Sequence, residues 1–129
     1  MLNSGLNQYK AVSTHGQLDE ATPHRVTQVM LETLSTRIAE ARGYAERGEI
    51  DQKGSAIGKA IAIVEGLVMS LDMQRGGEIA ANLEALYDYI FRGLLSANVS
   101  GNEAKLDEMA ALVSEIQTGW NGIALVDGA

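Results

Sequence analysis

Apolar residues recur along most of this chain at spacings of three and four, the pattern of helices that bury one face. Four segments show the pattern, and short polar or glycine-containing stretches separate them. No segment alternates with period two, so the sequence predicts an all-α fold, an antiparallel four-helix bundle over residues 21–125. The four predicted core stripes are Val26, Met30, Leu34, Ile38, Ala41 and Ala45; Ile57, Ile61, Val64, Val68 and Leu71; Ile79, Leu83, Leu86, Ile90 and Leu94; and Leu106, Met109, Val113, Ile116, Trp120 and Ile123.

The first helix has clear signals at both ends. Thr22 is a good N-cap, and Pro23 suits the first helical position, where its missing N–H costs nothing. Gly48 ends the helix. Residues 49–54 then form a polar connection, in which Asp51 is the candidate cap of the second helix.

The later helix boundaries depend on glycine and on short polar side chains. The glycine pair at 76–77 is expected to close the second helix, with one glycine in a left-handed conformation. Glu78 then falls in the first turn of the third helix, which runs to about residue 97. Ser100 and Glu103 have the spacing of a capping box before the fourth helix, and Asn102 is the rival cap.

The first 20 residues are polar and form a separate N-terminal leader. Leu6, Tyr9 and Val12 are its main apolar residues, and they recur every three positions. We expect the leader to be extended or a short helix. Two alternatives remain open: a disordered tail, or a tail that docks these three side chains on the bundle.

The second and third helices each carry a second apolar flank beside the core stripe, which we call a shoulder. Tyr87 lies roughly 80° and Phe91 roughly 120° around the helix from Ile79. Surplus apolar surface of this kind indicates a binding surface, unless a neighbouring helix covers it. The shoulders comprise Ala56, Ala60, Ile63 and Leu67 on the second helix and Ala80, Tyr87, Phe91 and Leu95 on the third.

The composition narrows the class of protein. The 129 residues carry a net charge of −7, and no basic patch indicates a nucleic-acid partner. There is no cysteine, which fits a reducing cytoplasm. The first residues lack a secretory signal, and no stretch is long and apolar enough for membrane insertion. We therefore expect a cytoplasmic protein.

The sequence offers no constellation of catalytic residues. His15 and His24 have no acid or nucleophile at a telling spacing, and a paired Glu-x-x-His motif for a di-iron site is absent. No phosphate-binding glycine loop occurs. Asp72, Glu78 and Asp88 are most simply caps and surface charges. We expect neither an enzyme nor a cofactor or metal, and a helical binding protein is the stronger class.

Residues 70–98 resemble the signature of the flagellin export chaperones, through the pattern SLDxxxGGEIAxNLxxLYDYxxRxLxxAN. The matching residues are Ser70, Leu71, Asp72, Gly76, Gly77, Glu78, Ile79, Ala80, Asn82, Leu83, Leu86, Tyr87, Asp88, Tyr89, Arg92, Leu94, Ala97 and Asn98. The resemblance extends from about residue 9 to residue 123. The chain departs from the family pattern in the first helix, at Thr27, Leu31 and Thr33.

The resemblance implies a chaperone that holds the C-terminal segment of flagellin in the bacterial cytoplasm. It would prevent premature polymerisation and deliver flagellin to the flagellar type III export apparatus. The shoulders and leader would bind this client by helix-in-groove recognition, and the leader would cover the groove when no client is present. The alternative is a helical interaction module that uses the shoulders for homo-oligomerisation, for example as a homodimer. The residues predicted to contact the client are Leu6, Tyr9, Val12, Ala60, Ile63, Leu67, Ala80, Tyr87, Phe91 and Leu95.

Overall fold

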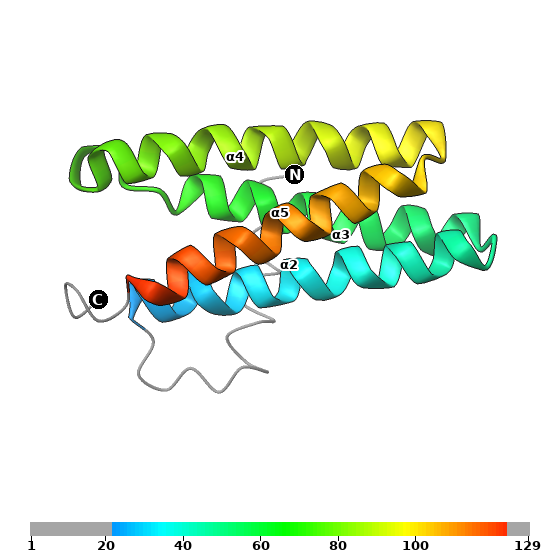
Figure 1. The fold of residues 1–129 in the computed structure, drawn as a ribbon, viewed down its shortest axis with the longest axis horizontal. Coiled ribbons are helices and arrows are strands. Elements are labelled where there is room, and N and C mark those ends of the chain that lie inside the picture. The colour runs from blue at the N-terminus through cyan, green and yellow to red at the C-terminus, as the bar shows by residue number, and fades with distance from the viewer. Residues whose placement is uncertain (1–21, 124–129) are drawn as a thin grey trace.

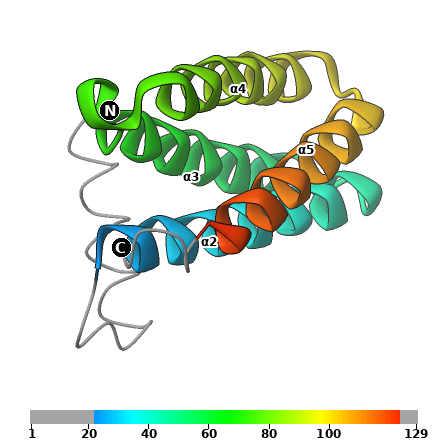
Figure 2. The ribbon, with the colours of Figure 1, turned by 60° about the vertical axis from the view of Figure 1, so that its left-hand side comes forward.

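The computed structural model describes residues 22–123, which form four consecutive helices. They are α2 (Pro23–Glu46), α3 (Ile50–Met69), α4 (Met73–Ser100) and α5 (Glu103–Gly122). Successive helices run antiparallel (Figure 1, and Figure 2 from a second side). Each helix packs against two others, so that the four form a ring in the order α2, α3, α4, α5 and back to α2. The predicted all-α four-helix bundle is confirmed, whereas the leader lies outside the described residues.

The core lies along the axis of this ring, and the stripes predicted for the first and last helices are correct. Met30, Leu34 and Ile38 of α2 are at most 2% exposed. Leu106, Met109 and Val113 of α5 are fully buried in the same cluster. These two helices each carry one continuous apolar stripe, so periodicity alone determines which face turns inward.

The first turn between helices is shorter than the sequence indicated. The Thr22 hydroxyl caps α2 by accepting a hydrogen bond from the Arg25 backbone N–H at 3.0 Å, and Gly48 follows the helix with a φ of 73°. However, α3 already begins at Ile50. The prediction that Asp51 caps this helix is therefore wrong: its carboxylate lies inside the first turn, where the helix dipole favours a negative charge.

The glycine pair at 76–77 does not close the second helix. Helix α3 ends at Met69, and the Asp72 carboxylate caps α4 by accepting from the backbone N–H groups of Gln74 (3.2 Å) and Arg75 (3.0 Å). One turn later Gly77 interrupts α4 with φ 51° and ψ −124°, a conformation available essentially to glycine alone. Gly77 does have a positive φ, but its ψ is not that of the expected left-handed helix cap, and it forms a kink near the start of α4.

Asn102, the alternative cap predicted from the sequence, is the N-cap of α5. The Asn102 side chain accepts a hydrogen bond from the Ala104 N–H at 3.1 Å. Ser100 instead belongs to the end of α4, where its hydroxyl donates to the Ser96 carbonyl at 2.7 Å. The predicted capping box between Ser100 and Glu103 is therefore wrong.

The inward faces of α3 and α4 differ most from the prediction. Ala60, Ile63 and Leu67, expected on a surface shoulder, are fully buried, whereas Val68, expected in the core, is 37% exposed. On α4, Tyr87 is 1% exposed and Ile79 is 54% exposed. Both helices are apolar over a wide arc. The neighbouring helices cover a face that includes residues of the predicted core stripe and residues of the shoulder. Most shoulder residues are therefore covered by a neighbouring helix and do not form a free binding surface.

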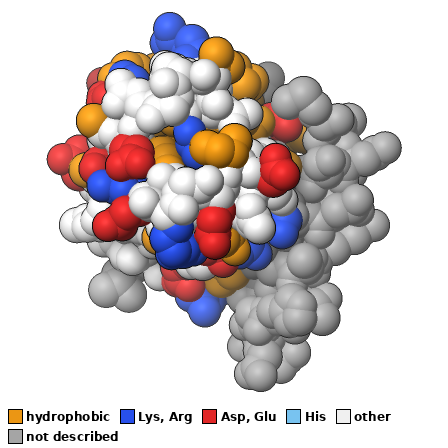
Figure 3. All heavy atoms as spheres, turned by 90° about the vertical axis from the view of Figure 1, so that its right-hand side faces the viewer, with side chains coloured by type: hydrophobic (Ala, Val, Ile, Leu, Met, Phe, Trp, Pro, Cys, Tyr) orange, Lys and Arg blue, Asp and Glu red, His pale blue; other side chains and the backbone are white. Residues whose placement is uncertain are grey.

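Polar contacts join the first and last helices at both ends of the bundle. At one end, the Trp120 indole N–H donates to the His24 carbonyl at 3.0 Å, while His24 Nε2 donates to the Trp120 carbonyl at 2.7 Å. The two rings stack with centroids 4.8 Å apart. At the other end, Arg42 pairs with Asp107 and Glu103 within a surface of intermixed acidic and basic side chains (Figure 3).

Candidate binding groove between α3 and α4

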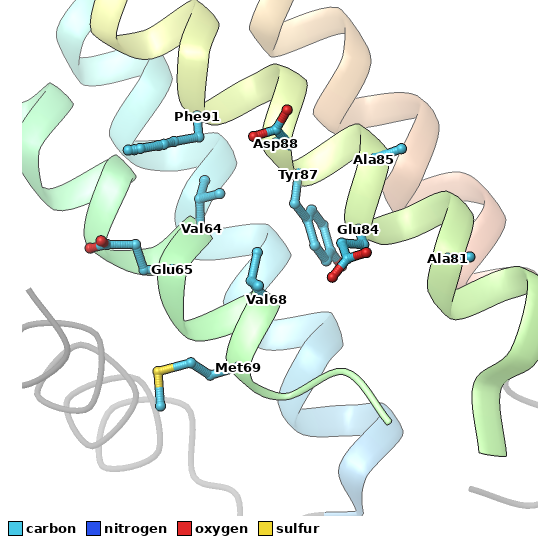
Figure 4. A pocket seen from close by; sticks show the side chains of 10 residues that line it. All are labelled: Val64, Glu65, Val68, Met69, Ala81, Glu84, Ala85, Tyr87, Asp88 and Phe91. Carbon is cyan, nitrogen blue, oxygen red and sulfur yellow. The ribbon is translucent and has the colours of Figure 1, made fainter. Parts of the chain in front are cut away.

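An open groove of about 670 Å³ lies between the second half of α3 and the middle of α4. Figure 4 shows Val64 and Val68 projecting from α3, and Tyr87 and Phe91 projecting from α4, into the space between the helices. Met69 stands at the end of α3 and is 52% exposed. A flexible methionine at such a rim can adapt to differently shaped apolar partners.

The floor of the groove is apolar and packed against the core. Val64 and Tyr87 are at most 1% exposed, and Phe91 is half-buried against the core. Burial raises the pKa of Tyr87 to about 12, because the phenolate would lose its hydration inside the protein. The floor is therefore uncharged at neutral pH and offers fixed contacts to an apolar side chain.

The rim of the groove is acidic. Glu65 lines it on α3, and Glu84 and Asp88 line it on α4 one turn apart. Asp88 pairs with Arg92 at 2.9 Å. Among residues 22–123, neither Glu65 nor Glu84 takes part in an ion pair, and no lysine or arginine contributes to the lining of the groove.

Two further hollows border α4. A smaller groove of about 320 Å³ lies between α4 and α5 and includes Leu83, Leu86, Leu112 and Ile116. A cavity of about 380 Å³ lies at the His24–Trp120 end of the bundle. Tyr87 contributes to the linings of both this cavity and the α3–α4 groove, so its ring stands between them.

The structure separates the residues that the sequence grouped as one site. Leu6, Tyr9 and Val12 lie outside the described residues. Ala60, Ile63 and Leu67 are buried in the core, and Ala80, which is 3% exposed, lines the end cavity, so the prediction of a surface position is wrong for these four. Tyr87 and Phe91 meet in the α3–α4 groove. Leu95, at 43% exposure, lies one turn beyond Phe91 on α4.

Sequence reasoning missed the α3 side of the groove. Val64 was correctly assigned to a core stripe but also lines the groove, whereas Val68 was assigned to the core and is 37% exposed. The sequence interpretation gave no role to Met69, Glu65 or Glu84. One signal was present: apolar residues continue to Val68 and Met69, at the very end of the helix, where a bundle core tapers.

The described part of the chain has no cluster of three or more His, Cys, Asp or Glu side chains that could hold a metal ion. Within the same residues, no helix is long and apolar enough to cross a membrane. The fold and the groove define residues 22–123 as an antiparallel four-helix bundle with an open apolar groove between α3 and α4.

Comparisons with known proteins identify the family. Residues 5–126 match the family model described as Flagellar protein FliS. The chain is 45% identical to the flagellar secretion chaperone FliSB of Pseudomonas aeruginosa over 119 residues, which cover 92% of this chain and 94% of the relative. It is 37% identical to the flagellar secretion chaperone FliS of Salmonella typhimurium over 122 residues, covering 94% and 90%.

The chain therefore belongs to the flagellar protein FliS family, whose named relatives are flagellar secretion chaperones. A more distant relative, FliS of Bacillus subtilis, is 27% identical over 114 residues, covering 88% of this chain and 84% of the relative. The family is one of export chaperones and not of enzymes.

Proposed function

We propose that this protein binds the disordered C-terminal segment of flagellin in the bacterial cytoplasm, prevents its premature polymerisation and delivers it to the flagellar type III export apparatus. The observation that carries the proposal is the α3–α4 groove, an apolar surface left open on a bundle whose relatives are named flagellar secretion chaperones. An amphipathic helix laid along this groove would bury its apolar face against Val68 and Phe91.

The energetics favour such a surface. A segment that is disordered when free loses conformational entropy on binding, and this loss must be offset by apolar contacts. A groove of about 670 Å³ can take several anchoring side chains, and its floor is already fixed by core packing. Binding of this kind needs no ATP hydrolysis.

A second candidate function, homo-oligomerisation, is supported by exposed apolar side chains near the α3–α4 turn. Met69, Met73 and Ile79 are 44–54% exposed. Light scattering of the protein alone decides this point, since a client-binding monomer and an obligate oligomer differ in mass.

The main test is a calorimetric titration of the protein with a peptide that comprises the flagellin C-terminal segment. Phe91→Ser should weaken binding roughly 30-fold, the effect of losing an aromatic anchor worth about 2 kcal/mol. Val99→Ser is the matched control because Val99 is 88% exposed on the same helix and outside the groove. Val68→Ser provides a second groove variant in case Phe91→Ser lowers the melting temperature strongly.

Failure of the wild-type protein to bind the peptide would overturn the proposed function. Equal effects of the groove variants and Val99→Ser would instead show that the client binds elsewhere on the bundle.

A further inference from the structure

We propose that the α3–α4 groove selects client segments in which lysine or arginine residues flank the apolar face of a helix. The inference rests on the proposed function and adds a rule of specificity to it. It depends on two properties of one site: an apolar floor, and a rim on which two carboxylates, those of Glu65 and Glu84, have no basic partner among the described residues.

The two carboxylates belong to opposite sides of the groove. Glu65 lies on α3 next to Val64, and Glu84 lies on α4 one turn before Asp88. Asp88, the third carboxylate of the lining, is already paired with Arg92 at 2.9 Å. A helix lying between α3 and α4 would therefore meet one negative rim on each flank.

Binding of a client helix increases the energetic effect of the Glu65 and Glu84 charges. Glu65 is already half-buried, and a helix that covers Val68 and Phe91 would remove further water from both carboxylates. A carboxylate that loses water without gaining a partner is unfavourable, whereas a nearby lysine or arginine compensates for the loss. An acidic residue on the client at the same place would add repulsion.

The expected effect is moderate and sensitive to salt. A partly exposed ion pair changes affinity about two- to fivefold. The Debye length falls from about 10 Å at 0.1 M salt to about 3 Å at 1 M, so the preference should shrink as salt is added. The apolar contribution of the floor does not weaken in this way, which separates the two sources of affinity.

The test uses two synthetic amphipathic peptides of about 18 residues, roughly five helical turns, that share one leucine face. One carries lysine and the other glutamate beside that face. Both are titrated calorimetrically into the full chain and into its Glu84→Gln and Glu115→Gln variants at low and high salt. Glu115 is the matched control because it is an exposed mid-helix glutamate that lines the α4–α5 groove instead.

We expect the lysine peptide to bind the wild-type protein at least about tenfold more tightly than the glutamate peptide at low salt. Glu84→Gln should lower the affinity for the lysine peptide about threefold, and Glu115→Gln should leave it unchanged. Equal binding of the two peptides, no binding of either, or an equal loss in both variants would overturn the inference. Because the flagellin peptide is titrated separately, a chaperone that binds flagellin without preferring the lysine peptide would retain its proposed function and lose only this specificity.

Discussion

Tyr87 is the residue at which the core and the groove meet. Its ring is 1% exposed, yet it contributes to the groove lining and to the cavity at the end of the bundle. A polar replacement such as Tyr87→Ser would leave a void and destabilise the protein by roughly 3–5 kcal/mol. A substitution of Tyr87 would therefore change stability as well as client binding. A substitution of Phe91, which is half-buried, is better suited to measuring the effect on binding alone.

The buried phenol of Tyr87 predicts a loss of stability at alkaline pH. Its pKa is raised from about 10 in the unfolded chain to about 12 in the folded protein. The unfolded state therefore loses this proton first, so the contribution is intact below pH 10 and falls as the pH rises towards 12. At pH 11.5 the folded protein should have lost about 2 kcal/mol through this group.

Urea unfolding of the wild-type protein and of Tyr87→Phe at pH 9 and pH 11.5 measures this contribution. The phenylalanine variant should gain about 2 kcal/mol relative to the wild type between the two pH values. Tyr44→Phe removes a phenol outside the groove and serves as the control. A constant difference between wild type and Tyr87→Phe would show that the hydroxyl reaches water in the folded state.

At the scale of the helices, the sequence was sufficient where one face alone is apolar. The stripes of α2 and α5 are correct for this reason. On α3, the true inward face takes Ile57, Ala60, Val64 and Leu67 from both predicted stripes. Periodicity cannot choose between two adjacent apolar stripes, because the choice depends on where the neighbouring helices lie. The groove on the edge of this face was consequently assigned to the core.

The pairing of His24 with Trp120 could not be predicted from the sequence because 96 residues separate them. We expect Trp120→Phe to destabilise the protein by about 1–3 kcal/mol, since it removes the indole N–H and part of a half-buried ring. Thermal or urea unfolding measures the loss. Gln28→Ala is the control: it breaks the exposed 2.8 Å hydrogen bond between Gln28 and Asn121, which joins the same helices, and should change stability by less than about 0.5 kcal/mol.

An equal loss in the two variants would mean that any contact between these helix ends matters as much as the stacked pair. Only a larger loss in Trp120→Phe supports a specific role for the indole N–H, which donates to the His24 carbonyl, and for the stacked rings.

At the scale of the whole molecule, the N-terminal leader is predicted to control access to the client groove. Leu6, Tyr9 and Val12 were expected to cover the client groove in the free protein, and they lie outside the described residues. If they cover it, a client must displace them, and its affinity is reduced by the free energy of that closure.

Deletion of residues 1–14 should leave the melting temperature nearly unchanged, increase the binding of a hydrophobic dye, and preserve or raise the affinity for the flagellin peptide. The residues of the core cluster, from Met30 to Ile116, are all present in this variant, so the melting temperature and the peptide affinity can be measured independently. A sharp fall in affinity would make the leader part of the binding site. Unchanged dye fluorescence would mean that the leader does not cover the groove.

The ring order of the helices also has a consequence for synthesis on the ribosome. Neighbours in the chain are neighbours in space for three of the four helix contacts, and only the contact between α2 and α5 spans the whole bundle. Local contacts of this kind favour rapid folding. The walls of the groove belong to α3 and α4, which precede α5 in the chain, so both walls emerge from the ribosome before α5. Contacts between α2 and α5 can begin where Arg42 meets Glu103 and Asp107, whereas the His24–Trp120 pair at the other end forms only after Trp120 has been synthesised.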